Sequence, residues 1–188
     1  MIAEQRDKRS QALQARRSMS AENRAAASVK ISEKIIRSHE FFAAKTVACY
    51  LPMRDEVDPA IVIERAWRAN KRVFCPVIGI HGDMIYRRLD RDTILQRSDF
   101  GLWEPTDSEF IPPRQLDLVV TPLVAFDEYN NRIGMGGGYF DRCFSFLKSR
   151  KRWKRPKLMG AAFKCQEVEK IDANPWDIPL YSVVHDAS

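Results

Sequence analysis

The chain has 188 residues and a mass of 21.7 kDa, enough for one α/β domain with a full core and too short for two ordinary domains. With 45% hydrophobic and 30% charged residues it is typical of a soluble globular protein, and no apolar run approaches the roughly 20 residues that a membrane span needs. The net charge of +6 favours an anionic partner, such as a nucleotide, a polycarboxylate or a nucleic acid. We therefore predict a single domain over residues 1–188 without a membrane contact.

The first half of the chain alternates predicted helices and strands. Residues 2–38 are rich in Ala, Arg, Gln and Lys, and Ser20 is suited to an N-cap between two helices. The β-rich segment 46–52 predicts a buried strand. A helix follows, with Asp58 as its predicted N-cap and Pro59 at its first position. Its candidate packing residues are Ile61, Ile63, Ala66 and Trp67.

The second half continues the alternation. Strands are predicted at 71–78 and 83–89, and after a connection rich in Pro, Asp and Ser the apolar run 116–127 leads to a glycine-rich loop. A helix is predicted over 139–150 and a further strand over 158–163. Strands that alternate with helices predict a mostly parallel sheet covered on both faces.

The cysteines and histidines are scattered. Cys49, Cys75, Cys143 and Cys165 form no C-x-x-C pair, and the three histidines are equally far apart. This spacing favours reduced core thiols over a disulfide framework or a zinc site. The start, MIAEQRDKRSQ, lacks the apolar core of a signal peptide, so the expected compartment is the cytoplasm.

The loop RIGMGGGYFDR, residues 132–142, holds four of the eight glycines within five positions. A strand, such a loop and a helix start bring free backbone N–H groups to the positive end of a helix dipole, which suits a phosphate. Missing Cβ atoms let the phosphate come close. The spacing G-x-G-G-G matches neither G-x-G-x-x-G nor G-x-x-x-x-G-K-[ST], so the pattern alone leaves a tight strand-to-helix turn as an alternative.

Three segments, YLPMRDEVDP, LDLVVTPLVAFDEYNNRIGMGGGYFDR and GAAFKCQEVEKIDANPWDIPL, resemble the signature blocks of the 5-formyltetrahydrofolate cyclo-ligase (5,10-methenyltetrahydrofolate synthetase) family, and the resemblance runs from about residue 5 to 185. It implies a single-domain, three-layer α/β/α sandwich. The implied activity is the ATP- and Mg²⁺-dependent conversion of 5-formyltetrahydrofolate, with or without a polyglutamate tail, to 5,10-methenyltetrahydrofolate, ADP and phosphate. We expect a monomer.

The implied chemistry explains the need for ATP. The formyl group is an amide, so its carbon is a poor electrophile and its oxygen a poor leaving group. Transfer of the γ-phosphoryl group to the formyl oxygen activates the carbon, N10 of the folate attacks it, and phosphate leaves as the ring closes. The protein mainly positions two ligands and neutralises charge on the moving phosphoryl group.

The resemblance assigns nucleotide and metal residues. Asp141 and Arg142 are the candidate catalytic residues, and Asp141 is also a Mg²⁺ ligand together with Asp177. The alternatives are a helix-dipole charge for Asp141 and a turn-forming role for Asp177. The nucleotide phosphates are expected against Arg9, Arg132, Ile133, Gly134, Met135, Gly136, Gly137, Gly138, Tyr139 and Phe140. A solvated side chain is the alternative for Arg9, and a core position is the alternative for Tyr139 and Phe140.

The folate is expected against Leu51 and Glu56, which follow a strand end where open α/β sheets gather ligands. The Glu56 carboxylate can accept hydrogen bonds from paired N–H groups of the pterin, or it is only a charge ahead of the next helix. The loop also departs from a common family form, roughly G-R-G-K-G, because Met135 and Gly137 replace the two cations. Arg132 and Arg9 are then the leading basic residues for the phosphates. Tyr181 stands where an acidic residue is common.

Two other function classes stay open. One is a nucleotide- or folate-binding regulatory protein with little turnover, which would keep the fold and form no ATP-dependent product. The other is a nucleic-acid-binding protein that uses the basic stretch LKSRKRWKRPK, residues 147–157, with Trp153 for stacking. The same stretch could instead attract polyglutamate tails or form a solvated face.

Overall fold

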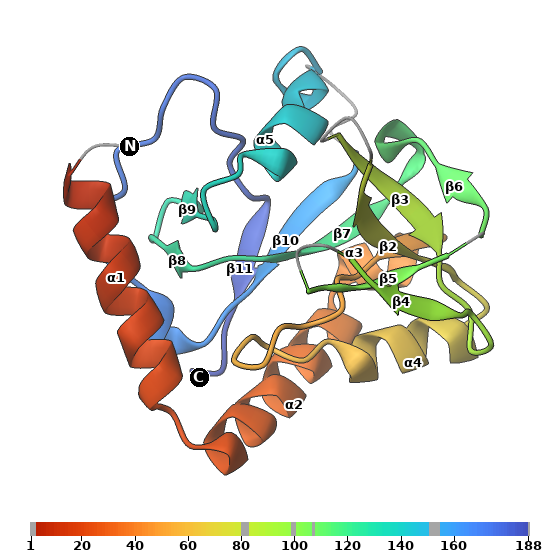
Figure 1. The fold of residues 1–188 in the computed structure, drawn as a ribbon, viewed down its shortest axis with the longest axis horizontal. Coiled ribbons are helices and arrows are strands. Elements are labelled where there is room, and N and C mark those ends of the chain that lie inside the picture. The colour runs from red at the N-terminus through yellow and green to blue at the C-terminus, as the bar shows by residue number, and fades with distance from the viewer. Residues whose placement is uncertain (1–2, 80–82, 99–100, 107, 151–154, 188) are drawn as a thin grey trace.

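A central sheet of seven strands organises the protein (Figure 1) in a computed structural model that describes residues 3–79, 83–98, 101–106, 108–150 and 155–187. Its order is β11-β10-β7-β1-β2-β3-β6. The strands are β11 (Ser182–Val184), β10 (Lys157–Ala161), β7 (Leu118–Pro122), β1 (Thr46–Ala48), β2 (Arg72–Ile78), β3 (Met84–Arg88) and β6 (Phe110–Ile111). Neighbours from β11 to β2 are parallel, and β3 is antiparallel to both β2 and β6. The predicted mostly parallel α/β sheet is confirmed.

Most of the N-terminal third of the chain is helical. Two long helices come first, and the short α3 (His39–Ala43) and then α4 (Ala60–Arg68) follow them. The first two are α1 (Ala3–Ser18) and α2 (Ala21–Arg37), and the Ser20 hydroxyl accepts a hydrogen bond from Asn23 N at 3.1 Å, so the predicted N-cap is confirmed. The helix α4 begins one residue later than predicted. Pro59 is its N-cap residue, and Asp58 Oδ1 accepts from Ala60 N at 2.9 Å.

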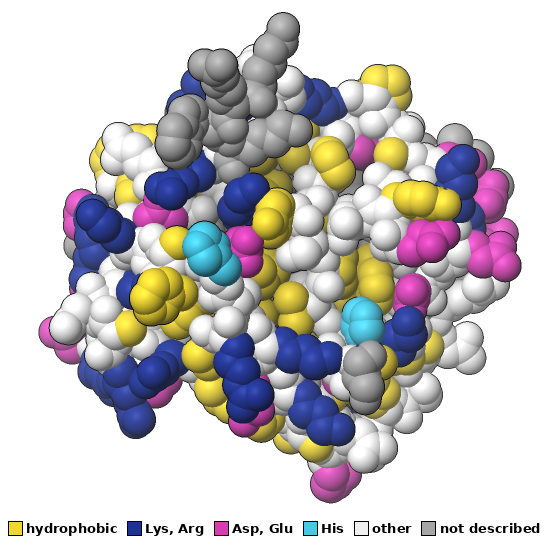
Figure 2. All heavy atoms as spheres, turned by 180° about the vertical axis from the view of Figure 1, so that it is seen from behind, with side chains coloured by type: hydrophobic (Ala, Val, Ile, Leu, Met, Phe, Trp, Pro, Cys, Tyr) yellow, Lys and Arg dark blue, Asp and Glu magenta, His cyan; other side chains and the backbone are white. Residues whose placement is uncertain are grey.

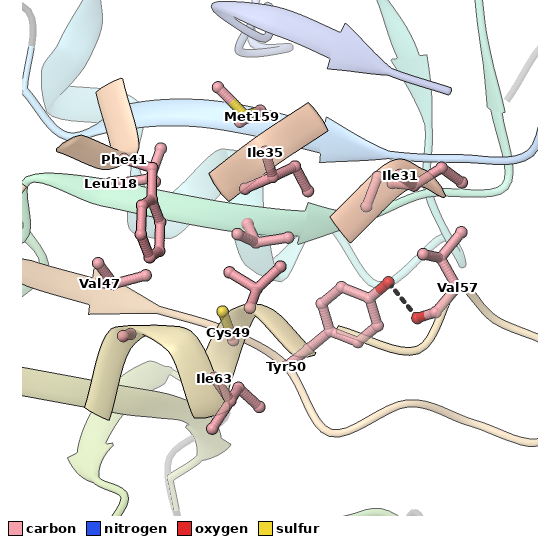
Figure 3. Packing of buried hydrophobic residues seen from close by; sticks show 14 of the residues in the cluster. Ile31, Ile35, Phe41, Val47, Cys49, Tyr50, Val57, Ile63, Leu118 and Met159 are labelled. Carbon is pink, nitrogen blue, oxygen red and sulfur yellow. Dashed lines mark hydrogen bonds between the residues drawn. The ribbon is translucent and has the colours of Figure 1, made fainter. Parts of the chain in front are cut away.

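The helices α2 and α4 cover one face of the sheet and form a hydrophobic core with it (Figure 3). Ile31 and Ile35 of α2 and Ile63 of α4 pack over Val47 and Leu118 of the central strands. The prediction of Ile61 as a packing residue is wrong, because Ile61 is 40% exposed while its neighbour Val62 is fully buried. Trp67 packs against this core but is only partly buried, and its Nε1 donates to Leu89 O at 2.8 Å.

The opposite face is covered by shorter pieces: α5 (Tyr139–Cys143), the 3₁₀ helix η2 (Ser145–Lys148) and the segment around Ile178. The continuous helix predicted over 139–150 is wrong. Its backbone leaves the helical region at Phe144, which has φ −102° and ψ 12° and whose ring is fully buried. That ring lies 6.0 Å from the ring of Tyr86. Burial of one aromatic side chain therefore outweighs helix continuity.

Two small hairpins lie outside the central sheet and were not predicted. They are β4 (Leu95–Arg97) with β5 (Trp103–Pro105), and β8 (Ala125–Phe126) with β9 (Arg132–Ile133). The apolar run 116–127 thus contains two strands, β7 and β8. The helix α1 packs on β8 through a separate small cluster that includes Ala12 and Ala125. The described residues also include the 3₁₀ helices η1 (Pro113–Gln115) and η3 (Lys164–Gln166).

Two further predictions concern the membrane and the thiols. Within the described part of the chain, every helix is too short or too polar to cross a membrane. All four cysteines are free, and Cys49 and Cys75 are buried as predicted for core thiols. Cys165 is exposed, so that prediction is wrong for this residue.

Candidate functional site

A cavity of about 920 Å³ lies where β1, β2 and β7 end. Leu51 follows β1, Ile78 ends β2, and Pro122 ends β7. The chain leaves β1 toward β2 on one side, and β7 leads to β10 on the other, so this is a switch point of the sheet, where open α/β proteins bind ligands. All the predicted site residues line this one cavity: Arg9, Leu51, Glu56, the run from Arg132 to Arg142, and Asp177.

The glycine loop leaves space for the side chains of Arg9, Tyr139 and Arg142. Gly136 has φ +102°, and a Cβ there would lie 2.9 Å from Nη2 of Arg9. Gly138 has φ +64°, and its Cβ would lie 3.0 Å from Nη1 of Arg142. At Gly137 a Cβ would lie 2.5 Å from the Tyr139 ring. The positive φ values favour glycine at positions 136 and 138, and a Cβ at any of the three positions would force a neighbouring side chain to move.

Both guanidinium groups are fixed to the loop's main chain. Nη2 of Arg9 donates to Gly134 O, and Nη1 of Arg142 donates to Gly137 O at 2.7 Å. The guanidinium of Arg142 also lies 5.0 Å from the centre of the Tyr139 ring. The loop thus places two positive charges beside its exposed backbone.

Arg132 and Asp141 form an ion pair beneath the loop. Nη2 of Arg132 lies 2.9 Å from Asp141 Oδ1, and the two side chains are only 5% and 24% exposed. Arg132 also donates through Nη1 to Ile178 O, and the same Oδ1 of Asp141 accepts from Ile178 N at 3.0 Å. This pair joins the loop, α5 and the segment around Ile178.

Asp177 holds a turn. Its Oδ2 accepts from Asn174 N at 2.7 Å and from Asn174 Nδ2 at 3.1 Å, as the turn-forming alternative requires. Among the residues that the structure describes, no three His, Cys, Asp or Glu side chains form a group that could hold a metal ion. Asp141 and Asp177 nevertheless both face the cavity.

The wall formed by the strand ends is mostly apolar with two carboxylates. Glu56 Oε2 accepts from Met53 N at 3.0 Å, and burial raises the pKa of this carboxyl above its ordinary value. The neighbouring Tyr50 is held by its hydroxyl, which donates to Val57 O at 2.6 Å (Figure 3). Burial also raises the pKa of the Cys75 thiol to about 12, so this cysteine stays protonated and is a poor nucleophile.

Three further residues of this wall were missed from the sequence. Met84 lies on β3, and Trp103 and Glu104 lie on β5. Glu104 is only 6% exposed, and its Oε1 accepts from Ile78 N at 3.4 Å. The only feature of the sequence that could have indicated this part of the wall is the carboxylate of Glu104 next to Trp103. The strand β5 has three residues, too few to show a hydrophobic period.

The basic stretch is described only in part, because Lys151, Arg152, Trp153 and Lys154 lie outside the described residues. Lys148 donates to Pro175 O, and Arg155 lies 2.9 Å from Asp117 Oδ1. On the face shown in Figure 2, the Lys and Arg side chains that the structure describes stand in several groups among Asp and Glu. Their arrangement on that face is not the continuous stripe that nucleic-acid binding favours.

The fold and the cavity define an α/β protein that takes its ligands at the carboxyl ends of parallel strands. The sequence model of the 5-formyltetrahydrofolate cyclo-ligase family matches residues 1–186, so the chain belongs to this family of enzymes. Two curated relatives carry the name 5-formyltetrahydrofolate cyclo-ligase. The one from Escherichia coli K12 is 34% identical over 177 residues, which cover 91% of this chain and 94% of the relative. The one from Haemophilus influenzae is 34% identical over 147 residues, 75% of each chain.

Solved structures show the same fold. The NMR structure of Aquifex aeolicus 5,10-methenyltetrahydrofolate synthetase matches with a TM-score of 0.83 and 28% identity, covering 98% of this chain and 90% of that one. A 5,10-methenyltetrahydrofolate synthetase from Mycoplasma pneumoniae matches with a TM-score of 0.75 over 97% of this chain and 99% of its own; at 24% identity it supports the fold alone. The predicted family and fold class are confirmed.

Proposed function

We propose that this protein uses ATP and Mg²⁺ to cyclise 5-formyltetrahydrofolate to 5,10-methenyltetrahydrofolate, with release of ADP and phosphate. The observation that carries the proposal is that a single cavity of about 920 Å³ holds both the glycine loop with its arginines and the strand-end wall with Glu56. Two ligands can therefore meet in one space, as transfer of a phosphoryl group from one to the other requires.

The glycine-loop side of the cavity suits the triphosphate. Arg9 reaches the loop from α1, so its charge lies beside the exposed backbone of the glycine loop. Phosphate oxygens prefer such N–H groups and planar guanidinium forks. We therefore assign the nucleotide to Arg9 and the run from Ile133 to Phe140.

The strand-end side suits the folate. Leu51, Met84 and Trp103 offer apolar surface, and the Glu56 carboxylate can accept the paired N–H donors of a pterin. If the two fused rings of the pterin bind on this side, the formyl group that they carry faces the glycine loop. The γ-phosphoryl group then passes to the formyl oxygen, N10 attacks the formyl carbon, and the phosphate leaves with that oxygen.

The metal ion fits the carboxylates of the cavity. Mg²⁺ prefers oxygen ligands and is commonly held by one or two carboxylates together with substrate phosphates, so a preformed cluster is not required. Asp141 and Asp177 would hold it, and when bound it would neutralise charge on the transferring phosphoryl group. Arg132 fixes the position of Asp141 through their ion pair.

Absorbance of methenyltetrahydrofolate tests the proposal directly. It should grow when the purified protein is mixed with 5-formyltetrahydrofolate, ATP and Mg²⁺, and it should stay flat when ATP or Mg²⁺ is withheld. Ligand binding without any product would favour the regulatory binding protein. Product without ATP would refute the phosphorylation mechanism.

A further inference from the structure

The phosphates of a nucleotide on this loop need positive charge that the loop sequence itself lacks. Residues 134–138 are Gly, Met, Gly, Gly and Gly. The helix that follows, α5, has only five residues, and a helix this short has a small dipole. Positive charge beyond that of Mg²⁺ therefore has to come from side chains outside residues 134–138.

Among the residues that the structure describes, four basic ones line the cavity: Arg9, Arg132, Arg142 and Lys148. Arg132 is the poorest candidate, since its side chain is 5% exposed and its charge is already balanced by Asp141. Withdrawing it for a ligand would leave Asp141 without its ion-pair partner below the loop, which is costly. Lys148 lies beyond α5, where its Nζ donates to Pro175 O.

Arg142 differs from Arg132 in its exposure and in its partners. Its side chain is exposed, and among the described residues its guanidinium donates only to Gly137 O, at 2.7 Å, while it lies over the Tyr139 ring. A guanidinium carries five N–H donors, so several remain for a ligand. The carbonyl and the ring restrict the rotamer in advance, which lowers the entropy lost on binding.

One guanidinium lies close to each of two glycines of the loop. A Cβ at Gly136 would be 2.9 Å from Nη2 of Arg9, and a Cβ at Gly138 would be 3.0 Å from Nη1 of Arg142. Two arginines that flank a stretch of bare backbone form a clamp for consecutive phosphate groups.

We propose that Arg142, paired with Arg9 across Gly136 to Gly138, is the cation that grips the phosphate chain of the nucleotide, and that Arg132 is a positioning residue for Asp141. This assignment rests on the proposed function. We assign the contact to the phosphates beyond the first, so Arg142 should contribute to binding of ATP and not to binding of AMP.

Calorimetric titration of the protein with ATP, ADP and AMP tests this assignment. Arg142→Ala should weaken ATP binding by about tenfold or more and leave AMP binding unchanged, because a charge-assisted contact is lost. Arg142→Lys should recover only part of the affinity, since it keeps the charge and loses the fork. Arg37→Ala is the matched control: Arg37 is an exposed arginine of α2 that pairs with Glu33, and its removal should change nothing.

Unaltered ATP binding by Arg142→Ala would overturn the assignment, and so would an equal loss for AMP. Thermal unfolding of each variant separates binding from folding; an exposed side chain should not lower the midpoint, and a large drop would mark Arg142 as structural. Failure of the parent protein to bind ATP at all would instead refute the proposed function, so the two failures are distinguishable.

Discussion

The two walls of the cavity are built in opposite ways. The glycine-loop wall, Arg9 with residues 134–142, consists of exposed backbone and guanidinium groups that hydrogen-bond to that backbone. The strand-end wall, which includes Leu51, Glu56 and Glu104, consists of side chains held by packing, with carboxylates as its charges. The glycine-loop wall owes its shape to glycines, which have no side chain. The strand-end wall owes its shape to side chains that pack together.

This difference predicts how substitutions act. In the glycine-loop wall, an added methyl group displaces a charged partner, so the effect should reach the nucleotide first. In the strand-end wall, an isosteric change alters one contact and leaves the wall in place, so the effect should be smaller and confined to the folate. Three substitutions test this difference between the two walls, and each has an outcome that would contradict it.

Gly136→Ala should have the largest effect. The added Cβ would lie 2.9 Å from the Arg9 guanidinium at a φ of +102°, so the loop must shift or Arg9 must leave. We expect kcat/KM for ATP to fall by about 100-fold, from backbone strain and a lost charge-assisted contact. Gly134→Ala is the control, because nothing lies within 4 Å of its Cβ and its φ is not positive. Normal ATP kinetics in Gly136→Ala would reduce the loop to a tight turn.

Asp141→Asn should follow. It keeps the side-chain shape and removes the negative charge beside Arg132, whose side chain is 5% exposed. Turnover should fall by at least about tenfold, and the free energy of unfolding should fall by about 2 to 3 kcal/mol, because a buried arginine loses its counter-charge. Kinetics at saturating Mg²⁺ and urea denaturation measure the two effects. A variant with parent-like turnover would leave Asp141 a structural role only.

Glu56→Gln should have the smallest effect on activity. The amide oxygen can still accept from Met53 N, so the wall stays in place. The KM for the folate should rise by about fivefold, or about 1 kcal/mol, more than the KM for ATP. Equal changes in both KM values would show that the two walls are not separate.

The same substitution has a signature in stability. Burial raises the pKa of Glu56, so folding of the parent protein loses stability as pH rises from the ordinary glutamate value through the raised one. Glu56→Gln lacks this loss, and it should therefore be more stable than the parent at pH 7. The gap should close below the ordinary glutamate pKa, where both side chains are neutral. Urea denaturation at pH 4 and pH 7 measures it.

The elements with long periodic patterns could be predicted from the sequence. The Ser20 cap, the helices on either side of it and the parallel strands all follow from local rules, and the family resemblance led to the glycine loop and Glu56. In each case neighbouring residues carry the information, so no knowledge of distant contacts was needed.

The remaining features depend on contacts between distant residues. Trp103 and Glu104 lie on a three-residue strand, too short for a period to emerge. Nothing in the sequence distinguishes Arg132 from Arg142, yet one is buried against Asp141 and the other is exposed on the loop. The break after α5 coincides with the burial of Phe144 next to Tyr86. These two residues are far apart in the sequence, so the pattern around Phe144 gives no information about their contact.

The hydrogen bonds of Ile178 bear on the order in which the protein is assembled. Arg132 and Ile178 are 46 positions apart, and Arg9 is 125 positions before the Gly134 carbonyl that it contacts. During synthesis on the ribosome, the glycine loop is therefore made long before the segment that holds it in place, although domains fold as units. A nascent chain that ends before Ile178 lacks the hydrogen bonds that this residue makes with Arg132 and Asp141. The lining of the cavity is therefore complete only after the segment around Asp177 has been made.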